Sequence, residues 1–214
     1  QFFFLQKTLL NLKNLEIMYL YSNKLSGSLP SELGNLDSLI YLNLEDNMIS
    51  STIPKELGNL KKLESIALTG NRLTGTIPSS FKNLILVRIL NLNNNFLSGC
   101  IPPEISKMKS LTGISLSENK LSSSIPSELS KLSLLIVLNL FNNEITGTLP
   151  PELGLIISLE ILELQNNKLS STIPSQYGLL SRLQVIMLQN NRLQGKIPSG
   201  FQGLYQMFLG NNID

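Results

Sequence analysis

The fold follows from a stretch that reads Leu42-Asn43-Leu44-Glu45-Asp46-Asn47-Met48-Ile49-Ser50-Ser51-Thr52-Ile53-Pro54. Leu42 and Leu44 alternate with polar neighbours, which is the period of two expected of a strand with one buried face. Asn47 follows where the chain is expected to turn inward. The residues that lead up to Ile53 are expected to form a second short strand, which Pro54 ends because proline has no N–H to donate.

This pattern recurs every 24 residues along the chain. The asparagine stands in the frame L-x-x-N-x-[LI] at Asn23, Asn47, Asn71, Asn95, Asn119, Asn143, Asn167 and Asn191. A Leu-Pro or Ile-Pro pair keeps the same period at Pro30, Pro54, Pro78, Pro102, Pro126, Pro150, Pro174 and Pro198. Self-similarity at a fixed period is typical of a solenoid. Residues 1–214 are therefore predicted to form a single domain of about eight full repeats, with partial repeats at both ends.

The repeat L-x-x-L-x-x-L-x-L-x-x-N-x-L-[ST]-[GS]-x-[IL]-P resembles the leucine-rich repeat in its plant-type subclass of 24 residues. The resemblance covers the chain from about Leu5 to Asn212. It implies an α/β repeat fold: a right-handed solenoid with a concave parallel β-sheet, short second strands and short convex 3-10 or helical turns. The subclass includes receptor-kinase ectodomains, receptor-like proteins and polygalacturonase-inhibiting proteins, so the resemblance implies protein recognition and leaves the ligand open.

Two columns of the repeat are predicted to be structural. A buried asparagine amide can donate to the carbonyls of one turn and accept from a neighbouring N–H, which satisfies backbone groups that no sheet reaches. In the second strand, a column of glycine and serine is expected where the backbone passes close to the core. This column comprises Gly27, Ser51, Gly75, Gly99, Ser123, Gly147, Ser171 and Gly195.

Composition excludes most catalytic chemistry. The chain has no histidine and one cysteine, Cys100, so it lacks an imidazole base, a Cys-His pair and a thiolate zinc cage. No metal or cofactor is therefore expected. Seventeen basic and 15 acidic residues give a net charge of only +2, which argues against a nucleic-acid partner. No apolar run approaches the ~20 residues of a membrane span. The sequence predicts a binding protein that catalyses nothing.

The outward positions of the predicted strands supply the candidate binding surface. Tyr19, Tyr21 and Tyr41 cluster near one end and are the expected anchors, because aromatic residues dominate the energy of many interfaces. Acidic residues on the strands face a single basic residue, Arg88, which favours a polar partner of mixed charge. The remaining candidates for contact with a protein or peptide are Asn43, Glu45, Thr69, Arg88, Asn91, Asn93, Asn139, Phe141, Glu163, Gln165, Met187 and Gln189.

The back of the solenoid offers a possible second contact. Columns that are polar in most repeats become apolar at Ile85, Leu86, Leu134, Leu155, Ile157 and Leu179. Neighbours on adjacent turns lie ~5 Å apart, close enough that these residues could merge into a patch. Two interpretations stay open: variation tolerated on a surface, or docking on a membrane protein or another subunit of a larger complex.

A different class of function is binding to ice or polysaccharide. Regular hydroxyl arrays can match a repeating lattice, and the second strands carry two such columns. The first comprises Ser26, Ser50, Thr74, Ser98, Ser122, Thr146 and Ser170. The second comprises Ser28, Thr52, Thr76, Ser124, Thr148 and Thr172.

The compartment is left open by two further features. The chain contains no N-x-[ST] sequon and none of the cysteine-paired caps usual in the subclass, and it opens with Phe2, Phe3 and Phe4. We therefore expect either missing flanking sequence or partners that cover the ends, since a solenoid needs covered terminal turns. The resemblance implies a secreted or cell-surface location, and the alternative is a subunit inside an organelle. Cys100 is expected to be a free, exposed thiol.

Overall fold

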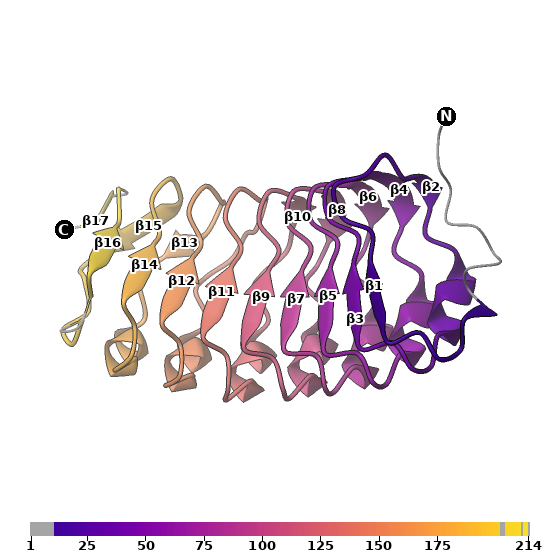
Figure 1. Cartoon of the computed structure of the whole chain (residues 1–214). Coiled ribbons are helices and arrows are strands. Elements are labelled where there is room, and N and C mark those ends of the chain that lie inside the picture. The colour runs from indigo at the N-terminus through magenta and orange to yellow at the C-terminus, as the bar shows by residue number, and fades with distance from the viewer. Residues whose placement is uncertain (1–10, 202–203, 211, 214) are drawn as a thin grey trace.

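A computed structural model describes residues 11–201, 204–210 and 212–213, so Phe2, Phe3 and Phe4 lie outside the described residues. Its main element is a parallel sheet of nine strands that runs the length of the molecule (Figure 1). In spatial order the strands are β1 (Ile17–Tyr19), β3 (Tyr41–Asn43), β5 (Ser65–Ala67), β7 (Ile89–Asn91), β9 (Gly113–Ser115), β11 (Val137–Asn139), β12 (Ile161–Glu163), β14 (Val185–Met187) and β16 (Gln206–Phe208).

The register of this sheet follows the repeat. Tyr41 pairs with Ser65, and Ser65 pairs with Ile89, so each step is one 24-residue turn. The last step is shorter, since Val185 pairs with Gln206, 21 residues on. The central residue of each strand from β1 to β14 is buried and contributes to one continuous hydrophobic core. The outer two residues of each strand point away from that core, as the period of two predicts.

The second strands are less regular than the sequence predicts. Five of them form one sheet: β2 (Ser26–Ser28), β4 (Met48–Thr52), β6 (Arg72–Gly75), β8 (Phe96–Gly99) and β10 (Lys120–Leu121). Three form another: β13 (Ser170–Ser171), β15 (Arg192–Gly195) and β17 (Asn212–Ile213). Between the two sheets the turns still touch, because the Thr146 N–H donates to the Ser123 carbonyl at 2.9 Å. Cys100 is exposed and follows β8 directly, rather than lying within it.

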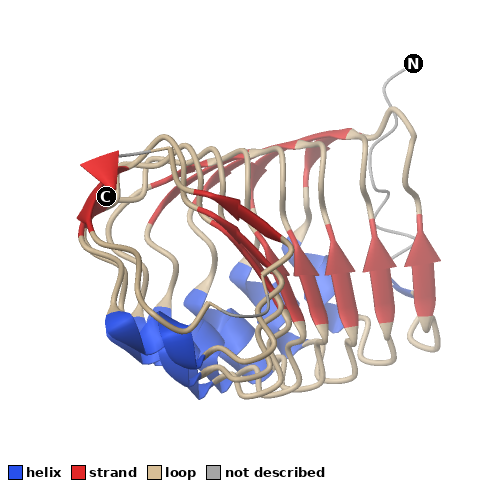
Figure 2. Cartoon of the chain, turned by 90° about the vertical axis from the view of Figure 1, so that its left-hand side faces the viewer, coloured by secondary structure: helices blue, strands red, loops and turns tan. Residues whose placement is uncertain are grey.

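The opposite side of each turn is a short 3-10 helix, and these helices form a layer apart from the nine-stranded sheet (Figure 2). Their bounds are η2 (Ser31–Asn35), η3 (Lys55–Asn59), η4 (Ser79–Asn83), η5 (Pro103–Lys107), η6 (Ser127–Lys131), η7 (Pro151–Leu155) and η8 (Ser175–Leu179). Each begins after a proline in extended conformation, such as Pro30 with φ −73° and ψ 142°. Acidic residues occupy the first turn of five of them, where the helix dipole favours negative charge.

The asparagine column is structural, as predicted. The Asn95 Nδ2 group donates to the carbonyls of Leu68, Leu92 and Asn93 at 3.0, 3.2 and 3.0 Å. Its Oδ1 atom accepts from the Leu73 N–H at 2.9 Å. One side chain therefore joins two successive turns and satisfies four backbone groups. The same arrangement holds at Asn47, Asn71, Asn119, Asn143 and Asn167.

The glycine and serine column has a conformational cause that the sequence analysis missed. Every member lies in the left-handed region, with φ between 69° at Ser123 and 89° at Gly195. Glycine adopts this conformation without steric penalty. Close packing adds to the effect at Gly75, where a Cβ atom would lie 2.8 Å from the Thr52 Cγ2 atom.

Candidate functional site

The candidate site is the concave face, which we define as the outward surface of the nine-stranded sheet with the residue two positions beyond each strand. The predicted contact residues lie on it from β1 to β14, with Arg88 at its margin immediately before β7. Because β1 and β14 stand near opposite ends of the sheet (Figure 1), these residues form a long band and not one compact site. A band of this shape suits an extended partner.

The predicted tyrosine cluster is a pair plus a separate third ring. The rings of Tyr19 and Tyr21 lie 6.5 Å apart between centroids and are tilted by 59°. Both side chains are about half exposed, at 55% and 54%. Tyr41 is less exposed, and its hydroxyl donates to Glu64 Oε2 at 3.5 Å. The pair at the start of the band therefore presents the larger aromatic surface.

A polar cluster follows around Glu45. Asn43 Nδ2 donates to Glu45 Oε2 at 3.3 Å, and Asn43 Oδ1 accepts from the Glu45 N–H at 3.0 Å. Asn91, two turns further on, donates through Nδ2 to Glu45 Oε1 at 3.1 Å. The residue that separates Asn43 from Asn91 in this column is Ala67, whose small side chain leaves room for the carboxylate to pass. Glu45 is thus held in place with its negative charge over Ala67, on the third strand of the sheet from the tyrosine pair.

Four polar atoms on the concave face have no hydrogen-bond partner within the described part of the chain. They are buried at the atomic level, although the residues that carry them remain partly exposed. Such an atom costs roughly 1–3 kcal/mol in desolvation unless a partner reaches it. The four are Thr69 Oγ1, Asn91 Oδ1, Gln165 Oε1 and Gln189 Oε1. Asn93, in contrast, is satisfied, because its Oδ1 atom accepts from both the N–H and the hydroxyl of Ser117 at 2.9 Å.

The far part of the band combines polar side chains with Phe141 and Met187. Burial raises the pKa of Glu163 above its usual value, because the charged carboxylate loses water there. Met187 stands next to Glu163 in the register of the sheet. Asn139, Phe141, Gln165 and Gln189 are also partly exposed. None of these residues approaches the tyrosine pair, so the structure does not bring the predicted contact residues together in one site.

The sequence analysis missed one feature of the concave face, a hollow over β9. Its volume is about 310 Å³. The lining residues are Ile89, Asn91, Thr112, Gly113, Ser115, Ile136 and Val137. Asn91 is the only one of these that the sequence had singled out. The available signal was Gly113, a glycine in an outward strand position where the neighbouring turns carry larger residues.

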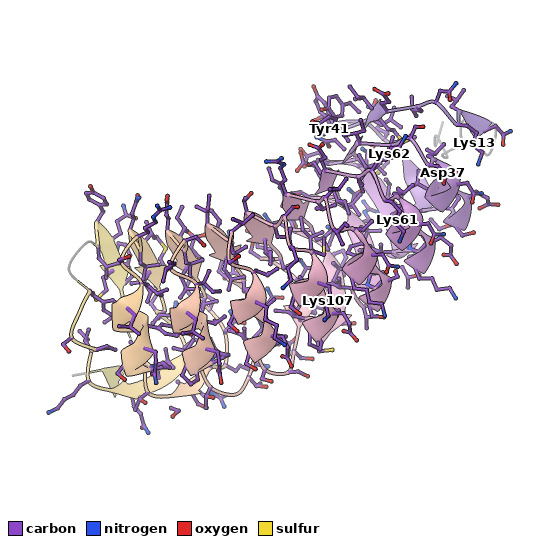
Figure 3. All side chains as sticks on the ribbon, turned by 90° about the horizontal axis from the view of Figure 1, so that it is seen from below. Lys13, Asp37, Tyr41, Lys61, Lys62 and Lys107 are labelled. Atoms are coloured by element: carbon purple, nitrogen blue, oxygen red, sulfur yellow. The ribbon has the colours of Figure 1, made fainter. Side chains whose placement is uncertain are left out.

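The six predicted apolar residues of the back are exposed, from 45% at Leu86 to 64% at Leu155 and Ile157. They do not form one patch, because Ile85 and Leu86 are separated from Leu134 by the turn that carries Lys109. Figure 3 views the molecule from this side and shows Lys61 and Lys107 on the row of 3-10 turns. Four of the six apolar residues lie on the later turns, whereas Ile85 and Leu86 lie between turns that carry lysines. A partner for this surface stays a prediction.

No metal centre emerges within the described ranges, where no three His, Cys, Asp or Glu side chains gather. Over the same residues, none of the helices has the length and apolar character needed to cross a bilayer.

Comparison with known proteins identifies the family. Residues 4–148 match the model of a leucine-rich repeat region, and residues 158–180 and 182–204 match that of the single leucine-rich repeat. The chain belongs to the leucine-rich-repeat family. The repeats are of the plant type, since plant receptor-kinase ectodomains are among its structural neighbours. Comparison with curated protein sequences gave no match.

Three solved structures show how the leucine-rich-repeat chain compares with its relatives. The TDR receptor superposes with a TM-score of 0.95 at 29% identity, over 97% of this chain and 37% of the receptor. The Arabidopsis receptor kinase HAESA, solved with the peptide hormone IDA and the co-receptor SERK1, gives 0.85 at 31% identity, over 94% and 39%. A plant ice-binding protein gives 0.72 at 25% identity, over 99% and 77%. The chain thus spans less than half the length of either receptor.

Proposed function

We propose that this leucine-rich-repeat chain is a non-catalytic binding module that recognises a protein or peptide on its concave face. The observation that carries the proposal is that the four buried polar atoms without a partner among the described residues all lie on that face. An extended peptide offers a regular series of N–H donors. Donors that reach these acceptors after small side-chain rotations remove an existing desolvation penalty.

The shape and composition of the face support the same proposal. An exposed tyrosine pair at one end supplies large amphipathic surfaces of the kind that anchor partners. The negative charges of Glu45 and Glu163 disfavour a polyanion along the band. HAESA, whose structure this chain matches closely, was solved with a peptide hormone.

A peptide display experiment tests the proposal. A library of random twelve-residue peptides is selected on the immobilised wild-type chain, and enriched peptides are then measured on two variants. The concave variant carries Ala67→Arg and Asn139→Arg, both at outward strand positions. The convex control carries Leu155→Arg and Leu179→Arg, at exposed positions on the back. Loss of binding to the concave variant alone supports the proposal, whereas equal binding to both variants contradicts it.

Binding to ice is a second candidate, because one structural neighbour is a plant ice-binding protein. The hydroxyl column Ser28, Thr52, Thr76, Ser124, Thr148 and Thr172 is exposed throughout. In the column that runs from Ser26 to Ser170, hydrogen bonds within the chain occupy some of the hydroxyls. The Ser170 hydroxyl, for example, donates to the Gly147 carbonyl at 3.2 Å. The surface is also interrupted where the second strands split into two sheets. A thermal-hysteresis measurement decides this candidate, and the absence of hysteresis removes it.

A further inference from the structure

Gly113 is the one glycine, among those the structure describes, whose position does not require glycine for its backbone conformation or its packing. Eight others have positive φ, from 39° at Gly210 to 117° at Gly200. At Gly34, Gly58, Gly154 and Gly178, a Cβ atom would collide with a backbone oxygen of the next turn. At Gly113, nothing lies within 4 Å of the position that a Cβ atom would occupy. Glycine inside a strand weakens the strand and often marks a place where a ligand approaches closely.

The missing side chain produces the hollow. Gly113 pairs with Ile89 on one side and with Val137 on the other, so two branched side chains face each other across an open floor. Ile89 is 50% exposed and Ile136 is 36% exposed, which leaves apolar surface in contact with water. The volume of about 310 Å³ admits a single aliphatic side chain together with some of the backbone that carries it. An aliphatic group seated here removes apolar surface from water on both sides of the contact.

Polar groups near the hollow indicate which residues of a partner lie next to an aliphatic side chain seated in it. Asn91 lines the hollow and carries one of the unpartnered acceptors, Oδ1, while its Nδ2 group holds the Glu45 carboxylate at 3.1 Å. The carboxylate lies over Ala67 in β5, two turns from Gly113, or roughly 10 Å at the spacing of adjacent strands. Glu163 lies two turns away on the opposite side, or roughly 10 Å at the spacing of adjacent strands. Arg88 lies immediately before β7, at the opposite end of this strand from Asn91. Glu64 and Glu160 occupy the same repeat position as Arg88 on other turns.

We propose that the hollow over Gly113 is the anchor site for an aliphatic side chain of an extended peptide with a basic residue on either side. This proposal rests on the proposed function, because it assumes that peptides bind the concave face. An extended chain advances about 3.3 Å per residue. The basic residues are therefore placed about three positions from the anchor on either side, one toward Glu45 and one toward Glu163.

The test compares peptides selected on the wild-type chain with their behaviour on hollow-filling variants. The probe is the same random twelve-residue library. Gly113→Val places a branched side chain in the hollow, where its Cβ atom meets no neighbour within 4 Å, and valine suits a strand, so the variant should fold. Ser133→Val adds apolar volume at an exposed position on the back and is the matched control. Thermal unfolding of both variants verifies the fold.

We expect enriched peptides to share one Leu, Ile or Val with Lys or Arg at the stated spacings. A synthetic peptide from this set should bind Gly113→Val about 30-fold more weakly, as expected for removal of a central anchor, and Ser133→Val without change. Glu45→Gln should lose the basic preference on one side only. Peptides that bind the concave face without an aliphatic residue, or that bind Gly113→Val equally well, overturn the anchor site and leave the proposed function standing. Peptides that tolerate Ala67→Arg with Asn139→Arg overturn both proposals.

Discussion

Asn91 donates a hydrogen bond to the Glu45 carboxylate at 3.1 Å, although the two residues are 46 positions apart in sequence. The contact joins the first and third of three successive turns over the small side chain of Ala67. It converts two outward columns into a connected polar surface and sets a negative charge two turns from Gly113.

The strength of this contact is measurable. A double-mutant cycle of Glu45→Ala and Asn91→Ala, followed by urea unfolding, should give a coupling free energy of about 1 kcal/mol, as expected of a partly exposed hydrogen bond. The pair Glu45→Ala and Asn139→Ala is the control, because no hydrogen bond joins those two side chains among the described contacts. A coupling of zero for the first pair would show that the contact does not form in solution.

The asparagine column should dominate local stability. Asn95→Ala leaves the carbonyls of Leu68 and Leu92 without their amide donor, so the free energy of unfolding should fall by about 1–3 kcal/mol or more. Asn119→Ala should behave alike, because its Nδ2 group donates to Leu92 and Leu116. Asn59→Ala, at an exposed position, should change stability little. Urea unfolding gives the three values, and equal stability of all three variants would contradict the structural role.

Two glycines should respond in opposite ways to the same substitution. Gly75→Ala forces a Cβ atom into a backbone conformation with φ 73° and toward Thr52, so it should destabilise the fold by about 1–2 kcal/mol. Gly113→Ala meets open space and lowers the entropy of the unfolded chain, so stability should hold or rise slightly. Thermal unfolding of both variants checks the contrast. A marked loss at Gly113 would mean that the backbone needs glycine there after all.

Glu163 should make stability depend on pH. Burial raises its folded-state pKa, so the folded chain binds this proton more tightly than the unfolded chain does. The resulting stability is fully present below the unfolded pKa, near 4.5, and is lost as pH rises through the folded pKa. Glu163→Gln, which cannot ionise, should therefore gain stability relative to the wild type as pH rises across this window.

Glu144 provides a control of opposite sign. The Lys168 ammonium, which donates to it at 2.8 Å, lowers its pKa. Its contribution is present above the unfolded pKa and lost as pH falls through the folded pKa, so Glu144→Gln should be less stable than the wild type at neutral pH. Urea unfolding at several pH values separates the two cases. Parallel pH profiles for Glu163→Gln and Glu144→Gln would refute both assignments.

Features that recur in every repeat were predictable from sequence, whereas contacts between particular residues on different turns were not. The alternation of Leu42 with polar residues predicts that its side chain is buried. The place of Asn47 after the strand predicts that its side chain points inward. The contact between Glu45 and Asn91 could not be predicted, because it depends on the small side chain of Ala67 in the turn between them. The hollow depends on three turns together, since Gly113 opens it only where Ile89 and Val137 flank it.

The irregular second strands have the same origin. The sequence repeats its small residues faithfully, yet strand pairing depends on how consecutive turns stack, and it lapses between β10 and β13. The cause of the small-residue column could not be predicted either, because glycine and serine are compatible with both close packing and a positive φ. Only the backbone angles, such as 71° at Ser51, distinguish the two.

Peptide binding on the concave face is open to direct measurement. Calorimetric titration of the most enriched library peptide tests it directly, with the wild type, the concave variant Ala67→Arg with Asn139→Arg, and the convex variant Leu155→Arg with Leu179→Arg. We expect an affinity at least about 30-fold weaker for the concave variant and an unchanged affinity for the convex variant. An unchanged affinity for the concave variant, with a loss in the convex one, would contradict the claim.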